Sequence, residues 1–395
     1  MARMARATTV LRFFAQGIAA LLAGCTTLLG GVQVNTVSVT AEKPSNVAVY
    51  LAVSDSGEPI GDLTADNFKL FENEQVVPFL DSQLTLLDRN LVAVHQAVLL
   101  VDMSGSLDEA ARHTAARAAA GFVQKVRRNQ AVAVFAFDGG SDLVPAGDFE
   151  RGSKDAGPAE IEQLANFTAR DSSRNLNGAV LEGLKQLESR MMAVKKPARV
   201  GTLVVLSRGP DMAGRASDEA VEKQLDDSRT DVIAVGIGEA EAPWLDRLGR
   251  FGVVRAQTPS TIGVALDQAA DKVALARNRY YLVSYCSPSR AGKRWVRIDV
   301  TFNKNGHERS GSVEHEFDAT GFSAGCDAKA PPSFAVAQAE INQASPQATE
   351  PAKAPETPSE PEPEPKAKAK PRPRPPAKPA NDTSVTPPEK PDFQP

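Results

Sequence analysis

The sequence has few of the residues from which catalytic and metal centres are usually built: four histidines and three cysteines among 395 residues. No histidine pair has the His-Glu-x-x-His spacing of a zinc hydrolase, and no Gly-x-Ser-x-Gly turn presents a nucleophilic serine. The histidines are His95, His113, His307 and His315. We expect a structural role for His95 and surface positions for His307 and His315. These absences predict a protein that is not an enzyme.

An excess of charge of one sign is also lacking. With 45 basic and 49 acidic residues the formal net charge is −4, so no global basic field attracts a nucleic acid. Long apolar runs are missing as well. The run from Phe13 to Ala23 has about eleven residues, which matches the hydrophobic region of a signal peptide and is too short to cross a bilayer as a helix. The sequence therefore predicts neither a nucleic-acid partner nor a membrane-spanning helix.

Residues 1–24 have the organisation of a signal peptide, with three arginines before the apolar run. The run ends in Leu22-Ala23-Gly24-Cys25, which closely resembles the lipobox of bacterial lipoproteins. This resemblance implies cleavage before Cys25 and attachment of lipid to its thiol and its new amino group. Because Thr26 follows instead of Asp, it also implies sorting to the outer membrane, on the periplasmic face or the cell surface. An ordinary secreted protein is the alternative.

The two remaining cysteines, Cys286 and Cys326, are predicted to form a disulfide, because an isolated pair in an exported protein is usually oxidised. The bond would close a loop of about 40 residues, for which the loss of chain entropy corresponds to roughly 4 kcal/mol. Two unrelated buried thiols are the alternative. A disulfide here would hold the end of the chain onto the strands before it.

The pattern of apolar residues divides the chain into a β-rich unit, an α/β domain and further strands. Residues 25–92 and 278–328 alternate apolar with polar side chains, as strands with one buried face do. Residues 93–277 contain uniformly apolar runs separated by helical segments, which indicates a mostly parallel, doubly wound sheet covered by helices. The expected helices are 107–126, 176–192, 218–227 and 262–276. We expect the two flanks to pack into one β-sandwich in which the α/β domain is inserted.

Residues 329–395 form a Pro/Ala/Lys/Glu-rich tail. From residue 330 onward lie 18 of the 28 prolines and few large apolar residues, so this segment cannot bury a core. Its prolines favour an extended conformation, and a disordered tail is predicted. A spacer is one interpretation of the tail, and an arm that touches the cell wall or a partner is the other.

The most informative motif is Asp102-Met103-Ser104-Gly105-Ser106, which joins an apolar strand to a helix. It resembles the Asp-x-Ser-x-Ser signature of von Willebrand factor A domains, at the matching place on the first strand of the sheet. In that family the motif belongs to a metal-ion-dependent adhesion site, where Asp102, Ser104 and Ser106 would hold Mg²⁺ for an acidic ligand group. Helix capping by the same residues is the alternative. The resemblance covers about residues 94–276.

Two positions depart from the family pattern. Arg174 stands where the family has a Thr ligand, and Arg208 stands where it has an Asp. Ser172, Ser173 or Asp211 could substitute after a small shift. A guanidinium about 5 Å from Mg²⁺ costs roughly 6–7 kcal/mol at an effective dielectric constant near 20, whereas a millimolar to micromolar metal site is worth about 4–8 kcal/mol. The sequence therefore favours a site without any cofactor, with Mg²⁺ as the alternative.

We predict that Asp102 pairs with Arg208, with Arg174 nearby, so that a guanidinium takes the place of the cation. The resemblance implies an adhesion-type module that binds a protein or an extracellular or envelope ligand through Asp102, Ser104, Ser106, Arg174 and Arg208. The alternative is a structural or assembly component of an envelope complex. In that case the site is inert, and the β-unit and the tail make the contacts.

Overall fold

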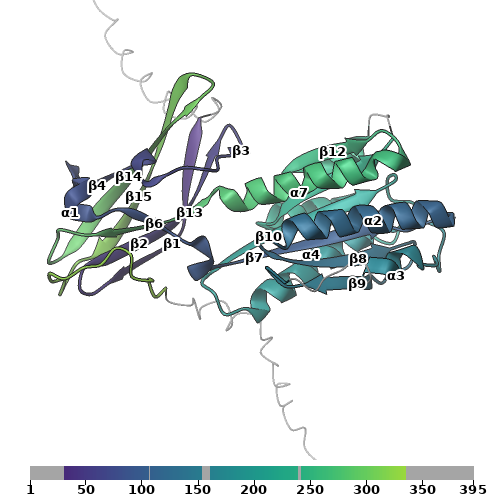
Figure 1. The fold of residues 1–395 in the computed structure, drawn as a ribbon, viewed down its shortest axis with the longest axis horizontal. Helices are drawn as coiled ribbons and strands as arrows, with labels where there is room; N and C mark the ends of the chain where they lie inside the picture. Colours follow the sequence, from purple (N-terminus) through teal and green to yellow (C-terminus); the bar gives the residue numbers. More distant parts are fainter. Residues whose placement is uncertain (1–30, 106, 154–160, 239–241, 335–395) are drawn as a thin grey trace, which may run out of the picture. The chain divides into compact units, whose positions relative to one another are not determined.

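The computed structural model describes residues 31–334, apart from 106, 154–160 and 239–241. The predicted signal peptide, Cys25 and Ser106 therefore lie outside the described residues, as does the chain beyond 334. The described part contains three sheets, here called A, B and C, and the helices that cover sheet C (Figure 1). Within these residues no helix is long and apolar enough to cross a membrane.

Sheet C is the core of the α/β domain, and its strands follow the order β12-β11-β10-β7-β8-β9. Neighbouring strands pair in parallel, except that the edge strand β9 is antiparallel to β8. The strands are β7 (Ala93–Asp102), β8 (Ala131–Phe137), β9 (Val144–Phe149), β10 (Ala198–Ser207), β11 (Asp231–Ile237) and β12 (Gly252–Ala256). Because β7 lies between β8 and β10, the chain winds outward from it in both directions.

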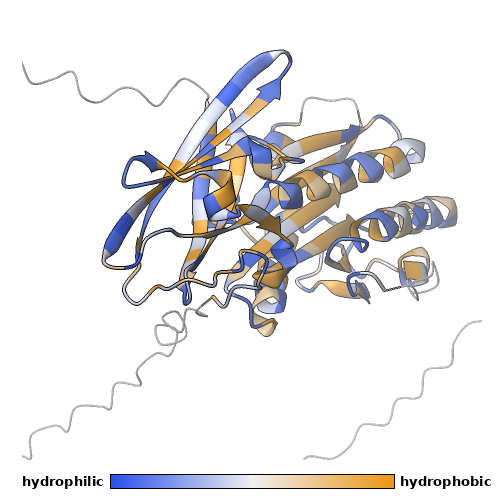
Figure 2. Ribbon diagram, turned by 60° about the vertical axis from the view of Figure 1, so that its left-hand side comes forward, coloured by the Kyte–Doolittle hydropathy of each residue, from blue (hydrophilic) through white to orange (hydrophobic). Residues whose placement is uncertain are grey.

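Helices cover both faces of sheet C, which explains why its strands are apolar on both sides. Leu99 of β7 packs with the first group of helices and Leu100 with the second. The first group is α2 (Glu109–Val126), α3 (Glu162–Ala165) and α7 (Ile262–Asn278), the last preceded by the short η4 (Pro259–Thr261). The second is α4 (Leu176–Ala193), α5 (Asp218–Asp227) and α6 (Pro243–Leu248). The strands of sheet C are largely hydrophobic, whereas the helices that cover them combine hydrophobic and hydrophilic positions (Figure 2).

The two flanks of this domain form a single β-sandwich. Sheet A contains β1 (Val32–Glu42), β2 (Asn46–Asp55), β3 (Glu58–Pro59), β6 (Thr85–Leu87) and β13 (Tyr280–Cys286). Sheet B contains β4 (Phe68–Glu72), β5 (Gln75–Val76), β14 (Lys293–Lys304) and β15 (His307–Asp318). Short helices connect them: η1 (Ala65–Asn67), α1 (Phe79–Ser82) and η2 (Arg89–Leu91). Since β13 pairs with β2 and β6, and β14 pairs with β4, the predicted insertion is confirmed.

The predicted disulfide is confirmed: Cys286, the last residue of β13, is bonded to Cys326, with Cα atoms 5.8 Å apart. It holds the segment after β15 against the β-sandwich. Residues 329–334, which the sequence analysis assigned to the tail, still contact β1, because the Ser333 amide donates to Glu42 Oε1 at 2.6 Å. The disulfide at Cys326 tethers the chain a few residues before Ser333. This tether explains why residues 329–334 contact β1 although their composition is that of a tail.

The prediction for His315 is wrong, whereas His307 is exposed as expected. His315 lies on the inner face of sheet B opposite Val296 and is 8% exposed. Neither ring nitrogen has a hydrogen-bond partner among the described residues. Burial lowers the pKa of His315 to about 4. The ring is therefore a neutral part of the sandwich core.

This burial predicts a specific dependence of stability on pH. The unfolded chain binds a proton at His315 below about pH 6.5, whereas the folded chain resists it until about pH 4. Stability should thus fall as the pH drops through this window, by up to about 3 kcal/mol from this residue. The substitution His315→Leu should remove that part of the slope. Urea unfolding of both proteins at pH 7, 6 and 5 measures it, and an unchanged slope in the variant would contradict the assignment.

Candidate functional site

The candidate site lies at the edge of sheet C where its central parallel strands end. Asp102 is the last residue of β7, and Ser104 follows it. Arg208 comes directly after β10, the neighbour of β7. Arg174 precedes Asn175, whose side chain caps α4 by accepting from the Gly178 amide at 3.1 Å. The carboxyl ends of parallel strands share one edge, so these segments meet there.

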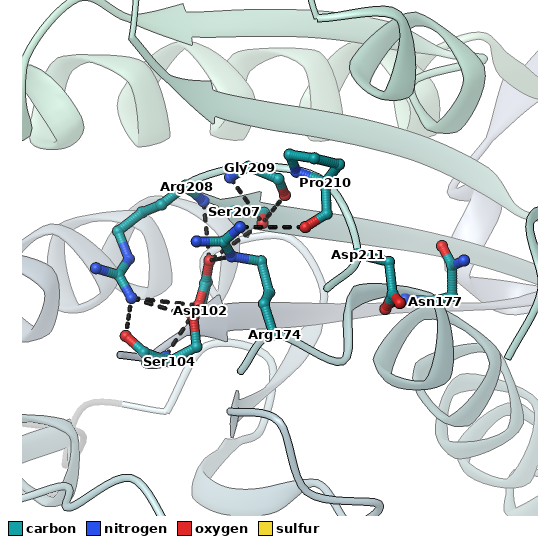
Figure 3. A network of polar contacts seen from close by, with 9 residues as sticks. All are labelled: Asp102, Ser104, Arg174, Asn177, Ser207, Arg208, Gly209, Pro210 and Asp211. Atoms are coloured by element: carbon teal, nitrogen blue, oxygen red, sulfur yellow. Dashed lines mark hydrogen bonds and ion pairs between the residues drawn. The ribbon is translucent and has the colours of Figure 1, made fainter. Parts of the chain in front are cut away.

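Five hydrogen bonds surround the Asp102 carboxylate (Figure 3). Its Oδ1 accepts from the Ser104 amide at 3.0 Å and the Ser104 hydroxyl at 2.6 Å. Its Oδ2 accepts from Arg174 Nε at 2.8 Å and the Arg208 amide at 2.9 Å, and it shares the single Ser207 hydroxyl proton, at 3.1 Å, with the Gly209 carbonyl, at 2.8 Å. A carboxylate offers about four lone-pair positions, so these donors saturate it.

The two arginines bind Asp102 in different ways. The Arg174 guanidinium is the direct side-chain partner, and its Nη1 also donates to the Pro210 carbonyl at 3.1 Å. The Arg208 guanidinium stands 3.6 Å from Oδ1, and its Nη2 donates to the carbonyl oxygen and, at 3.2 Å, to the hydroxyl of Ser104. The two arginines thus meet at Asp102 as the sequence analysis proposed. The shorter side-chain contact, however, belongs to Arg174 and not to Arg208.

Burial and charge together fix the ionisation of Asp102, whose side chain is fully buried. Burial by itself would raise its pKa. The hydrogen bonds from the Arg208 amide and from Ser104, with the charges of Arg174 and Arg208, outweigh burial and lower the pKa below its ordinary value. Asp102 is therefore a carboxylate that the protein itself neutralises.

Gly209 makes room for the Arg174 side chain. A Cβ atom at position 209 would lie 2.6 Å from Arg174 Nη1, which is closer than van der Waals contact permits. Any larger residue at 209 therefore requires the Nη1 end of the Arg174 guanidinium to shift. Ser207 and Gly209 were missed by the sequence analysis. Their positions immediately before and after Arg208 are the one signal that could have indicated them.

Two of the residues that could have restored the family's ligand set, Ser173 and Asp211, are engaged elsewhere. Ser173 donates to Asp171 Oδ1 at 2.8 Å. Asp211 accepts from the amides of Asn177 and Gly214, at 3.0 and 2.8 Å.

The alternative interpretation, that the Asp102 motif caps the following helix, also fails. Asp108 caps α2 by accepting from the Ala111 amide, and α2 accordingly begins at Glu109 and not at residue 107.

A divalent cation does not fit this arrangement. Its carboxylate ligand has no free lone pair, and two guanidiniums occupy the space beside it. Across the described residues, no group of three or more His, Cys, Asp and Glu side chains could hold a metal ion. At the position that the resemblance links to Mg²⁺, Asp102 is instead paired with Arg174 and Arg208.

Residues 93–277 form a mostly parallel α/β domain, with an antiparallel edge strand, helices on both faces and the Asp102 motif after the central strand. Solved structures similar to the chain include the ArnB paralog VWA2 from Sulfolobus acidocaldarius (12% identity, 73% of this chain and 74% of that chain, TM-score 0.35). A von Willebrand factor type A protein from Catenulispora acidiphila has 12% identity over 74% of each chain, with a TM-score of 0.35.

A third similar structure is proximal thread matrix protein 1 from the mussel byssus, with 17% identity and a TM-score of 0.37. The match covers 47% of this chain and about half, 49%, of the byssus protein. No protein-family model and no curated protein matches the chain.

Replacing both guanidiniums by the family's ligands should open the site to metal. The double variant Arg174→Thr, Arg208→Asp removes two positive charges and adds a hydroxyl and a carboxylate, so we expect it to bind Mg²⁺ or Mn²⁺ in the millimolar to micromolar range, about 4–8 kcal/mol. Calorimetric titration measures the binding. The single variant Arg174→Thr is the control and should stay without metal, because Arg208 remains. Stoichiometric binding of metal by the native protein would refute the assignment.

Proposed function

We propose that this chain is a non-catalytic binding protein of the bacterial cell envelope that takes a protein or matrix ligand at the carboxyl edge of sheet C, without a metal ion. The observation that carries the proposal is the saturated Asp102 carboxylate beside two guanidiniums with outward edges. Arg174 and Arg208 are 14% and 27% exposed, so both are held by the protein and still reach solvent.

The free edges of these guanidiniums supply the chemistry of recognition. Arg174 Nη2 and Arg208 Nη1 have no hydrogen-bond partner within the described ranges, and Figure 3 draws one nitrogen of each guanidinium without a contact. One carboxylate and two guanidiniums leave an excess of one positive charge. A carboxylate on the ligand matches that charge and the planar geometry of arginine donors.

The same contacts argue against catalysis at Ser104. A nucleophilic serine needs a base that accepts its proton, and the Ser104 hydroxyl instead donates to a carboxylate whose pKa is lowered. Such a carboxylate is a weak base, and the nearby guanidiniums cannot accept a proton. Binding is the function that this set of residues supports.

The location follows from the predicted lipobox. Cys25 lies seven residues before Val32, where β1 begins, and an extended chain of that length spans at most about 25 Å. Lipid on Cys25 would therefore keep the β-sandwich close to the membrane surface, at the outer membrane according to the residue after Cys25.

The binding proposal predicts affinity for a simple carboxylate in metal-free buffer. Titration of the native protein with N-acetyl-aspartyl amide in the presence of EDTA, followed by NMR, should shift the signals of residues around Arg174 and Arg208. Arg208→Gln should weaken binding at least about tenfold, because a charge-assisted hydrogen bond is lost. Arg128→Gln, which changes an exposed arginine just before β8 at the opposite edge of the sheet, is the matched control. Binding that needs added Mg²⁺, or equal binding by Arg208→Gln, would disprove the proposal.

The anchor has its own test. Cys25→Ser removes the thiol that would carry lipid, so we expect the variant to appear in the soluble fraction of cells while the native protein stays with membranes. Fractionation followed by immunoblotting reads the outcome. A variant that still fractionates with the membranes would show that the anchor lies elsewhere.

A further inference from the structure

The loop that follows Arg208 is held firmly at the rim of the candidate site. The Arg174 carbonyl accepts from the amides of Met212 and Ala213, at 2.8 and 2.9 Å. Asp211 fixes the same loop from the other side, because its carboxylate binds the amide of Asn177 in α4 and the amide of Gly214. Pro210 completes the fixation through its carbonyl, which accepts from Arg174 Nη1.

Met212 is 70% exposed although its backbone is fixed in this way. A single exposed apolar side chain is common on protein surfaces and by itself indicates nothing. Here, however, the same residue, Arg174, holds the backbone of Met212 and presents a guanidinium at the site. The side chain of Met212 thus projects from a rim that is already ordered, so contact with a partner costs little additional backbone entropy.

Other polar groups at this rim are already paired. Arg215 is 47% exposed, but its Nε donates to the Gly139 carbonyl at 2.6 Å and its Nη2 to Asp171 at 3.1 Å. Arg174 and Arg208 have guanidinium nitrogens without a partner among the described residues, and Met212 is the exposed large apolar side chain of the loop that follows Arg208. Arginine and methionine are both enriched in protein–protein interfaces, and methionine adapts its shape to different apolar partners.

We propose that Met212 is a second contact of the binding site, and that the partner is a polypeptide segment carrying a carboxylate and a large apolar side chain a few residues apart. This inference rests on the proposed function, since the carboxylate is taken by Arg174 and Arg208. The Pro210 carbonyl accepts a hydrogen bond from Arg174. Met212 lies two residues after Pro210, and two residues span at most about 7 Å. In an extended peptide, a similar distance separates one residue from the residues that follow it by one to three positions.

A matched set of capped peptides tests the pairing. The probes are acetyl-Asp-Leu-amide and its homologues with one or two glycines between Asp and Leu, each compared with the same peptide carrying Ser in place of Leu. Their affinities are measured by NMR titration of the full chain in EDTA. The variants are Met212→Ser and, as a matched control, Met192→Ser, which changes another exposed methionine, located near the end of α4.

We expect at least one Leu peptide to bind about three- to tenfold more tightly than its Ser counterpart, as partial burial of one leucine predicts. Met212→Ser should bring that ratio close to one, and Met192→Ser should leave it unchanged. Equal affinities of all Leu and Ser peptides, or a Leu advantage that survives Met212→Ser, would overturn the inference while the proposed function stands. Absence of binding by every peptide, including N-acetyl-aspartyl amide, would overturn the proposed function and this inference with it.

Discussion

The chemistry of the site depends on the need to neutralise one buried carboxylate. Asp102 is the last residue of the central strand, and its side chain has no access to solvent. A buried charge is tolerated only when it is paired and fully hydrogen-bonded. A cation can meet that need, and so can a set of donors from the protein. In this chain Arg174, Arg208, Ser104 and Ser207 meet it, so the carboxylate is complete before any ligand arrives.

The fold makes this solution possible. Helices on both faces bury the strands of sheet C. The carboxyl ends of strands β7 and β10 and the start of helix α4 meet at one edge of this sheet. Arg174 reaches Asp102 because Asn175 fixes the start of α4 and because Gly209 leaves space for the guanidinium. The second edge of each guanidinium then remains for a ligand. A metal-dependent site gains affinity from an ion that can leave, whereas in the proposed site the positive charges belong to Arg174 and Arg208.

The sequence was sufficient to predict the main architecture, because long apolar runs and amphipathic helices carry strong periodic signals. It also indicated that Arg208 would meet Asp102, since each lies at the end of a parallel strand, and the resemblance to the family pattern placed Arg174 nearby. It could not show which arginine makes the shorter contact, because that depends on rotamers and on the space beside Gly209. The burial of His315 was missed although the alternation in β15 indicates it: Val313 and Phe317, two residues to either side, share its face and pack in the sandwich core.

The central claim is that guanidiniums occupy the position of a metal ion. A crystal of the native protein soaked in MnCl₂ tests it most directly, because the anomalous scattering of manganese distinguishes a bound ion from a water molecule. The account predicts no anomalous peak near Asp102, with the Arg174 Nε still about 2.8 Å from the carboxylate. A manganese peak within about 2.3 Å of Asp102 or Ser104 oxygens, with Arg174 turned away, would contradict it.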